Sequence, residues 1–275
     1  MKTDVSYMSG AGNLFTVIDN EKYRFSLSEG AALAPRLCHL NEVNSFATEG
    51  LILVSKSEDS EIDFSATFYN PDGTCDAMCG NGGRCAVRFA LLHGISSQKN
   101  YRFTMANAIF RYSLNEDLIS LYFPAPKAFR VNFYVQSDNV VYCGTYVDVG
   151  TRHFIVNFQD YFGTADFKST DITASAKTIR YTKEFAPHGT NVDFYKILPD
   201  AVYLRTYERG VELETGACGT GVLSTAIALN SLNFVKFPVK VIPTSGIPLY
   251  VAKGETDEYL LTGPAEVLNV VSLQI

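Results

Sequence analysis

The chain of 275 residues is long enough for two domains that each bury a core of their own. Hydrophobic residues make up 47% of it and charged residues 19%, which is the balance of a globular protein and not of a disordered or fibrous one. A formal net charge of -6, with no cluster of lysine and arginine, argues against nucleic acid as a partner and favours a small-molecule ligand.

The sequence predicts a cytoplasmic protein that does not bind a membrane. Its first residues, MKTDVSYMSGAGNLF, lack the apolar run of a signal peptide, and no later stretch reaches membrane-spanning length. In the reducing cytoplasm the six cysteines should be thiols, so that any special role they have is metal binding or catalysis. They are Cys38, Cys75, Cys79, Cys85, Cys143 and Cys218.

Short strands with β-branched and aromatic residues are predicted along most of the chain. They are expected at Phe15–Ile18, Leu51–Val54, Ile62–Tyr69, Leu118–Phe123, Arg152–Phe158 and Val192–Ile197, and the same style continues from Phe234 onward. A helix is predicted over Ser28–Leu40, and Pro35 is expected to shorten or split it.

Two further helices are predicted, and they share one design. Each begins directly after a cysteine and a glycine, the first in segment 79–94 (CGNGGRCAVRFALLHG) and the second in segment 218–230 (CGTGVLSTAIALN). In the first, Asn81 is expected to cap the start and Gly94 to end the helix. Thr220 holds the corresponding capping position in the second.

The spacing of these segments suggests two equivalent lobes. Cys79 and Cys218 lie 139 positions apart, about half the chain, although the strands show no obvious sequence repeat. Two nearby prolines in segment 123–127 (FPAPK) interrupt both helix and ladder pairing, so this segment is predicted as the boundary.

A thiol at the start of a helix can act as a base. It lies beside unpaired backbone N–H groups and the positive end of the helix dipole, which should lower its pKa from about 8.5 toward neutrality. The following glycines let backbone amides approach a bound carboxylate closely. An amino acid between two such starts would lose its α-proton to one thiolate and gain another from the opposite thiol. The pattern therefore predicts racemisation at an α-carbon.

No organic cofactor is expected, because the sequence has no motif for a Schiff-base lysine, no Rossmann glycine fingerprint and no P-loop. No metal site is expected either. Cys75, Cys79 and Cys85 include no C-x2-C pair and have no nearby histidine. The ordinary alternative for a cysteine is a small buried hydrophobic residue, and the four other cysteines keep that interpretation. Cys79 and Cys218 differ because chance matching of two Cys-Gly-polar-Gly helix starts is rare.

At these residues the sequence resembles the diaminopimelate epimerase family, which interconverts the LL and meso forms of diaminopimelate on the route to lysine and peptidoglycan. Segment 70–85 (NPDGTCDAMCGNGGRC) looks like the first catalytic motif of the family. Segments 208–210 (ERG) and 217–221 (ACGTG) look like the second. Segments 10–13 (GAGN) and 190–192 (TNV) are similar to further motifs, so the resemblance covers nearly the whole chain.

The resemblance implies an α+β fold of two pseudo-symmetric lobes, each a mixed β-sheet or barrel wrapped around a central helix. The N-terminal lobe would span residues 1–124 and be completed by the final strand, about 263–275. The C-terminal lobe would span residues 125–262. The active site is expected in the cleft between them, and whether the chain forms a homodimer is left open.

The resemblance also implies a cofactor-independent epimerisation of LL- to meso-diaminopimelate, with Cys79 and Cys218 as the acid/base pair. The residues expected to bind the substrate are Asn13, Asn70, Gly80, Asn81, Asn191, Glu208, Arg209, Gly219 and Thr220. Arg209 would hold the distal carboxylate in a bidentate manner. His153 would support the site by orienting a neighbour. Without the motif, Asn70 is more often a turn former and Glu208–Arg209 more often a surface pair.

The chain departs from the family pattern in three places. Segment 150–153 (GTRH) stands where the family usually has Gly-Asn-Pro-His, which removes a substrate-facing Asn and adds an Arg. Ser9 replaces a usual His, and one extra residue lies between Glu208 and Cys218. These departures bear on substrate specificity and leave the two thiols unchanged.

Two alternatives stay open. The first is another racemase of the same superfamily, such as a proline or hydroxyproline type, with a different or broader substrate range. The second is an amino-acid-binding or redox-sensing protein in which Cys79 and Cys218 form a reversible disulfide.

Overall fold

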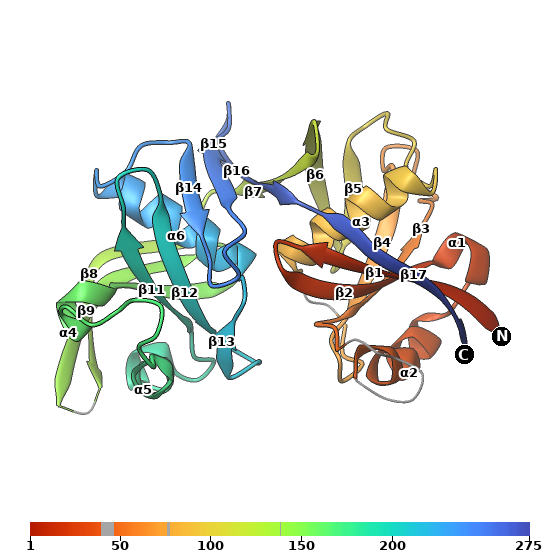
Figure 1. The fold of residues 1–275 in the computed structure, drawn as a ribbon. Coiled ribbons are helices and arrows are strands. Elements are labelled where there is room, and N and C mark those ends of the chain that lie inside the picture. The colour runs from red at the N-terminus through yellow and green to blue at the C-terminus, as the bar shows by residue number, and fades with distance from the viewer. Residues whose placement is uncertain (40–46, 76–77, 138) are drawn as a thin grey trace. The chain divides into compact units, whose positions relative to one another are not determined.

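The computed structural model describes residues 1–39, 47–75, 78–137 and 139–275. The chain divides into two compact units, residues 1–122 with 262–275 and residues 123–261. Each unit combines a mixed sheet with one long buried helix (Figure 1). The sequence predicts two domains, 1–124 with about 263–275 and 125–262. That each folds on its own stays a prediction.

Unit 1 is a mixed sheet with two parallel strand pairs among antiparallel ones. Its strands are β1 (Lys2–Gly10), β2 (Asn13–Asp19), β3 (Leu51–Ser55), β4 (Phe64–Tyr69), β5 (Arg102–Met105), β6 (Ala108–Asn115), most of β7 (Leu118–Pro124) and β17 (Glu266–Gln274). The parallel pairs are β2 with β3 and β4 with β5, and the other neighbours are antiparallel. β17 pairs with β1 along its length, so the two termini lie side by side (Figure 1).

The helices of unit 1 are α1 (Asn20–Tyr23), α2 (Leu27–Cys38) and α3 (Gly80–Leu92). α3 is the central helix, because ten of its 13 residues are buried and it contacts β1, β2, β3 and β4. Where a strand passes close to the backbone of this enclosed helix, the strand needs a small residue. A β-carbon on Gly10 would lie 2.5 Å from the carbonyl oxygen of Asn81, so this contact requires glycine.

Unit 2 has a second mixed sheet. Its strands are β8 (Ala128–Ser137), β9 (Val140–Asp148), β10 (Arg152–Asn157), β11 (Asn191–Ile197), β12 (Val202–Glu208), β13 (Leu213–Thr215), β14 (Val239–Ile242), β15 (Leu249–Lys253) and most of β16 (Glu258–Pro264). Its helices are α4 (Phe158–Phe162), α5 (Thr173–Arg180), the 3-10 helix η1 (Lys183–Phe185) and α6 (Gly219–Ser231). Ten of the 13 residues of α6 are buried, and it contacts β9, β10, β11, β14 and β15.

The two units repeat one order of strand pairing. In unit 1 an antiparallel hairpin leads into the parallel pair β2–β3, then the antiparallel pair β3–β4, then the parallel pair β4–β5. In unit 2 the same order runs through β10–β11, β11–β12 and β12–β14. The buried helix, α3 or α6, lies in the connection to the second parallel pair. The expected α+β fold of two pseudo-symmetric units is thus confirmed, although the strands show no sequence repeat.

The six predicted strands are present with small changes at their ends. β4, predicted over Ile62–Tyr69, begins at Phe64. β10 ends at Asn157 because Phe158 starts α4. The structure adds strands that the sequence pattern did not single out, among them β1, β8, β9 and β12. Within the described ranges no helix is long and apolar enough to cross a membrane.

The expectation that Pro35 would shorten or split its helix is wrong. α2 runs through Pro35 to Cys38, and the predicted end at Leu40 lies outside the described residues. A capping box formed by Ser26 and Glu29 fixes the start of the helix. Burial of Leu33, Ala34 and Leu37 offsets the cost of the proline, about 3 kcal/mol in a helix interior.

Candidate active site

Cys79 lies at the very start of α3. It is the N-cap residue, with φ -113° and ψ 113°, and its Sγ accepts a hydrogen bond from the N–H of Gly82 at 3.4 Å. The sulfur therefore satisfies one of the backbone donors that a helix start leaves unpaired. The expectation that Asn81 caps this helix is wrong, because the cysteine side chain takes that role. Gly94 follows the C-cap residue with φ +64°, so the predicted end of the helix is confirmed.

Asn81 belongs to a chain of buried polar groups. Its Nδ2 donates to Oδ1 of Asn13 at 3.2 Å, and its Oδ1 accepts from Nη2 of Arg84 at 2.6 Å. Nδ2 of Asn13 in turn donates to the Glu49 carboxylate. Asn13 and Asn81, both predicted as site residues, are thus brought together beside the start of α3. Gly80, the first residue of α3, is buried beside them.

Arg84 is a buried cation that the sequence did not single out. It is 0% exposed, and its Nε donates to the carbonyl oxygen of Pro264 at 3.3 Å. Its Nη1 has no hydrogen-bond partner among the described residues, and no carboxylate there forms an ion pair with it. Burial lowers the pKa of the guanidinium to about 10, and the nearby Cys85 and Cys79 oppose this shift. Unit 1 therefore holds a positive charge close to Cys79.

Asn70 lies in the turn that follows β4. Its backbone N–H donates to the carbonyl oxygen of Thr74 at 2.8 Å, and its Nδ2 donates to Oγ1 of Thr74 at 2.9 Å. Asp72 accepts from the same threonine. These bonds are those of a turn former, and they leave Oδ1 and the second N–H of Nδ2 for contact with a substrate.

Cys218 starts α6 as Cys79 starts α3. It is the N-cap residue with φ -107° and ψ 108°, and its Sγ lies 3.5 Å from Oγ1 of Thr220. The backbone angles of the two cysteines agree within 10°, as expected of equivalent helix starts. The prediction that Thr220 caps α6 is wrong, because Cys218 holds the N-cap position.

The electrostatic surroundings of Cys218 oppose ionisation. Burial raises the pKa of the Cys218 thiol well above its usual range, and the carboxylates of Glu208 and Asp193 add to the rise. The hydroxyl of Thr220 and the N–H of Gly221 lower it by less. The sequence-based expectation that each helix start lowers the pKa of its thiol is therefore wrong for Cys218, because burial and two acids outweigh the hydrogen-bond donors at the start of α6.

His153 joins the start of α6 to a buried acid. Its Nδ1 lies 2.6 Å from Oδ2 of Asp193, and both side chains are 0% exposed. Its Nε2 lies 3.0 Å from Oγ1 of Thr220 and 3.0 Å from Oγ1 of Thr151. The predicted supporting residue thus contacts a predicted binding residue, Thr220. Asp193 was not predicted, although an acid within a buried strand is a signal that could have found it.

Asn191, Glu208 and Arg209 meet at the ends of β11 and β12. Oδ1 of Asn191 accepts from the backbone N–H of Arg209 at 2.7 Å, and its Nδ2 donates to the carbonyl oxygen of Arg152 at 3.0 Å. Glu208 accepts from Oγ1 of Thr215 at 2.8 Å, and burial raises the pKa of its carboxyl. The exposed Arg209 side chain makes no hydrogen bond or ion pair within the described ranges. Its guanidinium is therefore available to an anion.

Sequence comparison with known proteins assigns the chain to a family. The sequence profile described as diaminopimelate epimerase matches residues 5–119. A diaminopimelate epimerase from Chlorobaculum tepidum is 39% identical, over 94% of this chain and 96% of that protein. The chain belongs to the diaminopimelate epimerase family. A second member, from Aquifex aeolicus, is 35% identical over 93% of this chain and 92% of that protein.

Solved structures with a similar fold extend beyond the diaminopimelate epimerase family. A phenazine biosynthesis protein of the PhzF family from Bacillus anthracis superposes with a TM-score of 0.72 at 14% identity, with all of both chains covered. A hydroxyproline epimerase from Agrobacterium vitis gives a TM-score of 0.71 at 13% identity, over 99% of this chain and 92% of that one. At these identities the likeness concerns the fold alone.

Each unit of this family member therefore holds its own half of the predicted site. At the start of α3 lie Cys79, Gly80, Asn81 and Asn13, and Arg84 donates a hydrogen bond to Asn81. At the start of α6 lie Cys218, Gly219, Thr220 and His153, and Asp193 contacts His153. Within the described ranges no group of three or more His, Cys, Asp or Glu is placed to hold a metal ion.

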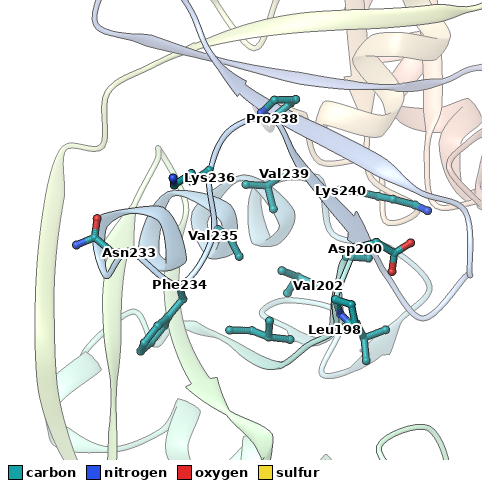
Figure 2. Close-up of a pocket in the computed structure, with 13 residues that line it drawn as sticks. Leu198, Asp200, Val202, Asn233, Phe234, Val235, Lys236, Pro238, Val239 and Lys240 are labelled. Carbon is teal, nitrogen blue, oxygen red and sulfur yellow. The ribbon is translucent and has the colours of Figure 1, made fainter.

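A pocket of about 390 Å³ lies elsewhere in unit 2, between the β11–β12 turn and the segment that links α6 to β14 (Figure 2). Asp200 and Lys240 line it together with apolar residues such as Val235. None of the predicted site residues lines this pocket. It is therefore not part of the candidate active site.

Proposed function

We propose that this chain is an isomerase that interconverts LL- and meso-diaminopimelate by moving the proton of one α-carbon from one face to the other. The observation that carries the proposal is the pair of equivalent helix starts, each with a cysteine at the N-cap, in a chain 39% identical to a diaminopimelate epimerase. The product would serve the lysine and peptidoglycan routes that the family resemblance implies.

Cys79 and Cys218 would be the acid/base pair, and their surroundings assign the resting roles. Cys79 receives a backbone N–H bond and lies near the buried cation Arg84, so its thiolate is the better stabilised of the two. Cys218 lies near two carboxylates, which favour its thiol form. In the resting enzyme Cys79 would therefore be the base and Cys218 the acid, and turnover would exchange their protons.

The reaction needs both thiols at one substrate, on opposite faces of its α-carbon. Removal of the proton places negative charge on the α-carboxylate, which backbone amides at helix starts can stabilise. The N–H groups of Gly80 and Asn81 on α3 and of Gly219 and Thr220 on α6 are the donors we assign to that carboxylate. The reaction then proceeds without pyridoxal phosphate.

The non-reacting end of diaminopimelate carries a second amino group and a second carboxylate. Arg209 is exposed and makes no ion pair within the described ranges, so it is suited to bind that carboxylate with two parallel hydrogen bonds. Glu208, with Asn13, Asn70 and Asn191, would bind the amino groups and complete the selection for a diamino-dicarboxylic acid.

A second candidate is a racemase with a different or broader substrate range. Segment 150–153 supports it, because Thr151 bonds to His153 where the family usually has a substrate-facing Asn, and the side chain of Arg152 reaches Asp148 at 4.0 Å. The thiol chemistry would be unchanged, and only the residues that contact the distal end would differ.

We also propose that the enzyme works in the cytoplasm and that a homodimer is compatible with its activity. None of the six cysteines forms a disulfide, and both reacting cysteines must stay reduced for acid/base work. A reducing compartment meets that need.

A substrate panel under reducing conditions, without pyridoxal phosphate, tests the function. We expect conversion of LL- to meso-diaminopimelate, and no conversion of L-proline, trans-4-hydroxy-L-proline or L-lysine. Arg209→Ala should raise KM for diaminopimelate while the fold is retained. Conversion of the imino acids but not of diaminopimelate would refute the proposed substrate and favour the second candidate.

A further inference from the structure

We propose that Asp193 is a positioning residue: it holds and charge-stabilises His153, which takes up the proton of Cys218 through Thr220 when Cys218 must act as a base. This inference rests on the proposed function. It concerns residues of unit 2 only, on β10, β11, β12 and α6.

Asp193 is built into unit 2 as a fixed, buried anion. One oxygen, Oδ2, contacts Nδ1 of His153 at 2.6 Å, and the other, Oδ1, accepts from Oγ1 of Thr206 at 2.6 Å. A β-carbon on Gly221 would lie 2.7 Å from Oδ1, so the glycine of α6 makes room for this carboxylate. A buried carboxylate is costly unless its bonds are made, and here both oxygens have donors.

The amide of Asn191 fixes the tautomer of His153. Its Oδ1 accepts from the backbone N–H of Arg209, and its Nδ2 donates to the carbonyl oxygen of Arg152, so its orientation follows from two backbone bonds. That orientation places Nδ2, a donor, 3.3 Å from Nε2 of His153. Nε2 must therefore be an unprotonated acceptor. The ring proton lies on Nδ1 and is donated to Asp193.

A hydroxyl connects this acceptor to the sulfur. Oγ1 of Thr220 lies 3.0 Å from Nε2 of His153 and 3.5 Å from Sγ of Cys218. When the S–H bond of Cys218 breaks, its proton passes to Oγ1 while Oγ1 gives its own proton to Nε2. The products are a Cys218 thiolate and an imidazolium ion paired with the Asp193 carboxylate, so charge and protons balance. The negative charge of Asp193 stabilises the imidazolium, as the carboxylate of a serine-protease triad does.

The other charged groups around Cys218 define the pH dependence. Within the described part of unit 2, the carboxylates of Asp193 on β11 and Glu208 on β12 both disfavour the thiolate. Arg152, next to His153 on β10, has its side chain near Asp148. Without an internal acceptor, Cys218 would ionise only at alkaline pH. The chain through Thr220 and His153 allows it to work near neutrality.

The test compares Asp193→Asn with wild type over pH 6 to 10. We expect kcat/KM to fall about 100-fold at pH 7, the size of a lost general acid/base contribution, and the loss to shrink as pH rises because hydroxide then deprotonates Cys218 directly. Asp63→Asn is the matched control. Asp63 is also a buried carboxylate with several donors, but it lies in unit 1, and its variant should keep the wild-type pH profile.

A second measurement needs no variant. Nitrogen-15 NMR of histidine-labelled wild type should show one ring, assigned to His153, with a proton on Nδ1 and none on Nε2 near neutral pH. A proton on Nε2, or a kcat/KM of Asp193→Asn that stays within threefold of wild type across the pH range, would overturn the inference. An inactive wild type would instead count against the proposed function, and the NMR result would still decide the tautomer.

Discussion

Cys79 and Cys218 have nearly the same backbone conformation but opposite electrostatic surroundings. A buried guanidinium, Arg84, lies near the first, and two carboxylates, Asp193 and Glu208, lie near the second. The motif could identify both thiols, because a cysteine followed by glycines at a helix start is a local pattern. It could not reveal this asymmetry: Arg84 and Glu208 lie in the motif segments, but their burial, and the approach of Asp193 to Cys218, depend on the fold.

The asymmetry predicts unequal reactivity of the two thiols toward alkylation. At pH 7.5 without substrate, iodoacetamide should modify Cys79 several times faster than Cys218, because alkylation needs a thiolate. Cys218 is also only 6% exposed. Peptide mass spectrometry over time would give both rates, with Cys38, itself buried, as an internal reference. Faster modification of Cys218 would contradict the assigned resting roles.

Replacement of Arg84 tests the charge beside Cys79. Arg84→Gln should lower kcat/KM at pH 7 by about 10-fold or more, since each pKa unit of lost thiolate stabilisation is worth a factor of ten. Arg88→Gln is the matched control, because Arg88 lies one turn later on α3 and, among the residues that the structure describes, its side chain bonds to the carbonyl oxygen of Asp117 alone. Equal activities of the two variants would show that the buried charge does not assist Cys79.

At the scale of elements, the segment between β12 and α6 is held by two arginine–glutamate pairs. Arg180, the last residue of α5, binds both oxygens of Glu212, and Arg205 of β12 binds both oxygens of Glu214. This segment follows Glu208, the last residue of β12, and carries Arg209 and the extra residue relative to the family pattern. The two bidentate pairs tie this segment to α5 and β12.

The Arg180–Glu212 pair predicts a pH-dependent stability. Arg180 lowers the pKa of the Glu212 carboxyl from 4.5 to about 2. A depressed pKa in the folded state contributes stability that is present above about pH 4.5 and is lost as pH falls toward 2. Glu212→Gln should therefore unfold more easily than wild type at pH 7, and the difference in urea midpoint should vanish near pH 2. A difference that is independent of pH would contradict the ion pair.

The sequence predicted strands and helices well where the signal came from neighbouring residues. Alternating β-branched and aromatic residues located six strands, and the two helix starts followed from their glycines. It failed for Pro35, where the tertiary contacts of Leu33 and Leu37 override a weak helix position. The repeated pairing order was also hidden from the sequence, because strand pairing depends on burial and register and many different side chains satisfy both.

At the scale of the whole chain, the C-terminal strand belongs to the unit that contains the N-terminus. β17 pairs with β1 from Lys2–Gln274 to Ser9–Glu266, and Val271, Leu273 and Ile275 pack on the core beside Val5 and Ile18. Unit 1 therefore requires residues from both ends of the chain.

One pair of substitutions tests this use of β17. Leu273→Ala should lower the free energy of unfolding by about 1–3 kcal/mol, since it removes a side chain from the core. Val270→Ala should change it by less than about 0.5 kcal/mol, because Val270 is 56% exposed. Urea unfolding of both variants gives the comparison. Equal effects would mean that β17 does not complete the core of unit 1.

The most direct test of the two-thiol mechanism is the exchange of the α-proton of LL-diaminopimelate in deuterated, reducing buffer without pyridoxal phosphate. Wild type, Cys79→Ala and Cys218→Ala would be compared by NMR for deuterium at the α-carbon and for formation of the meso isomer. Wild type should incorporate deuterium as it forms the meso isomer, and each variant should lose epimerisation while it remains folded. Epimerisation at the wild-type rate by either variant would contradict the assignment of Cys79 and Cys218 as the acid/base pair.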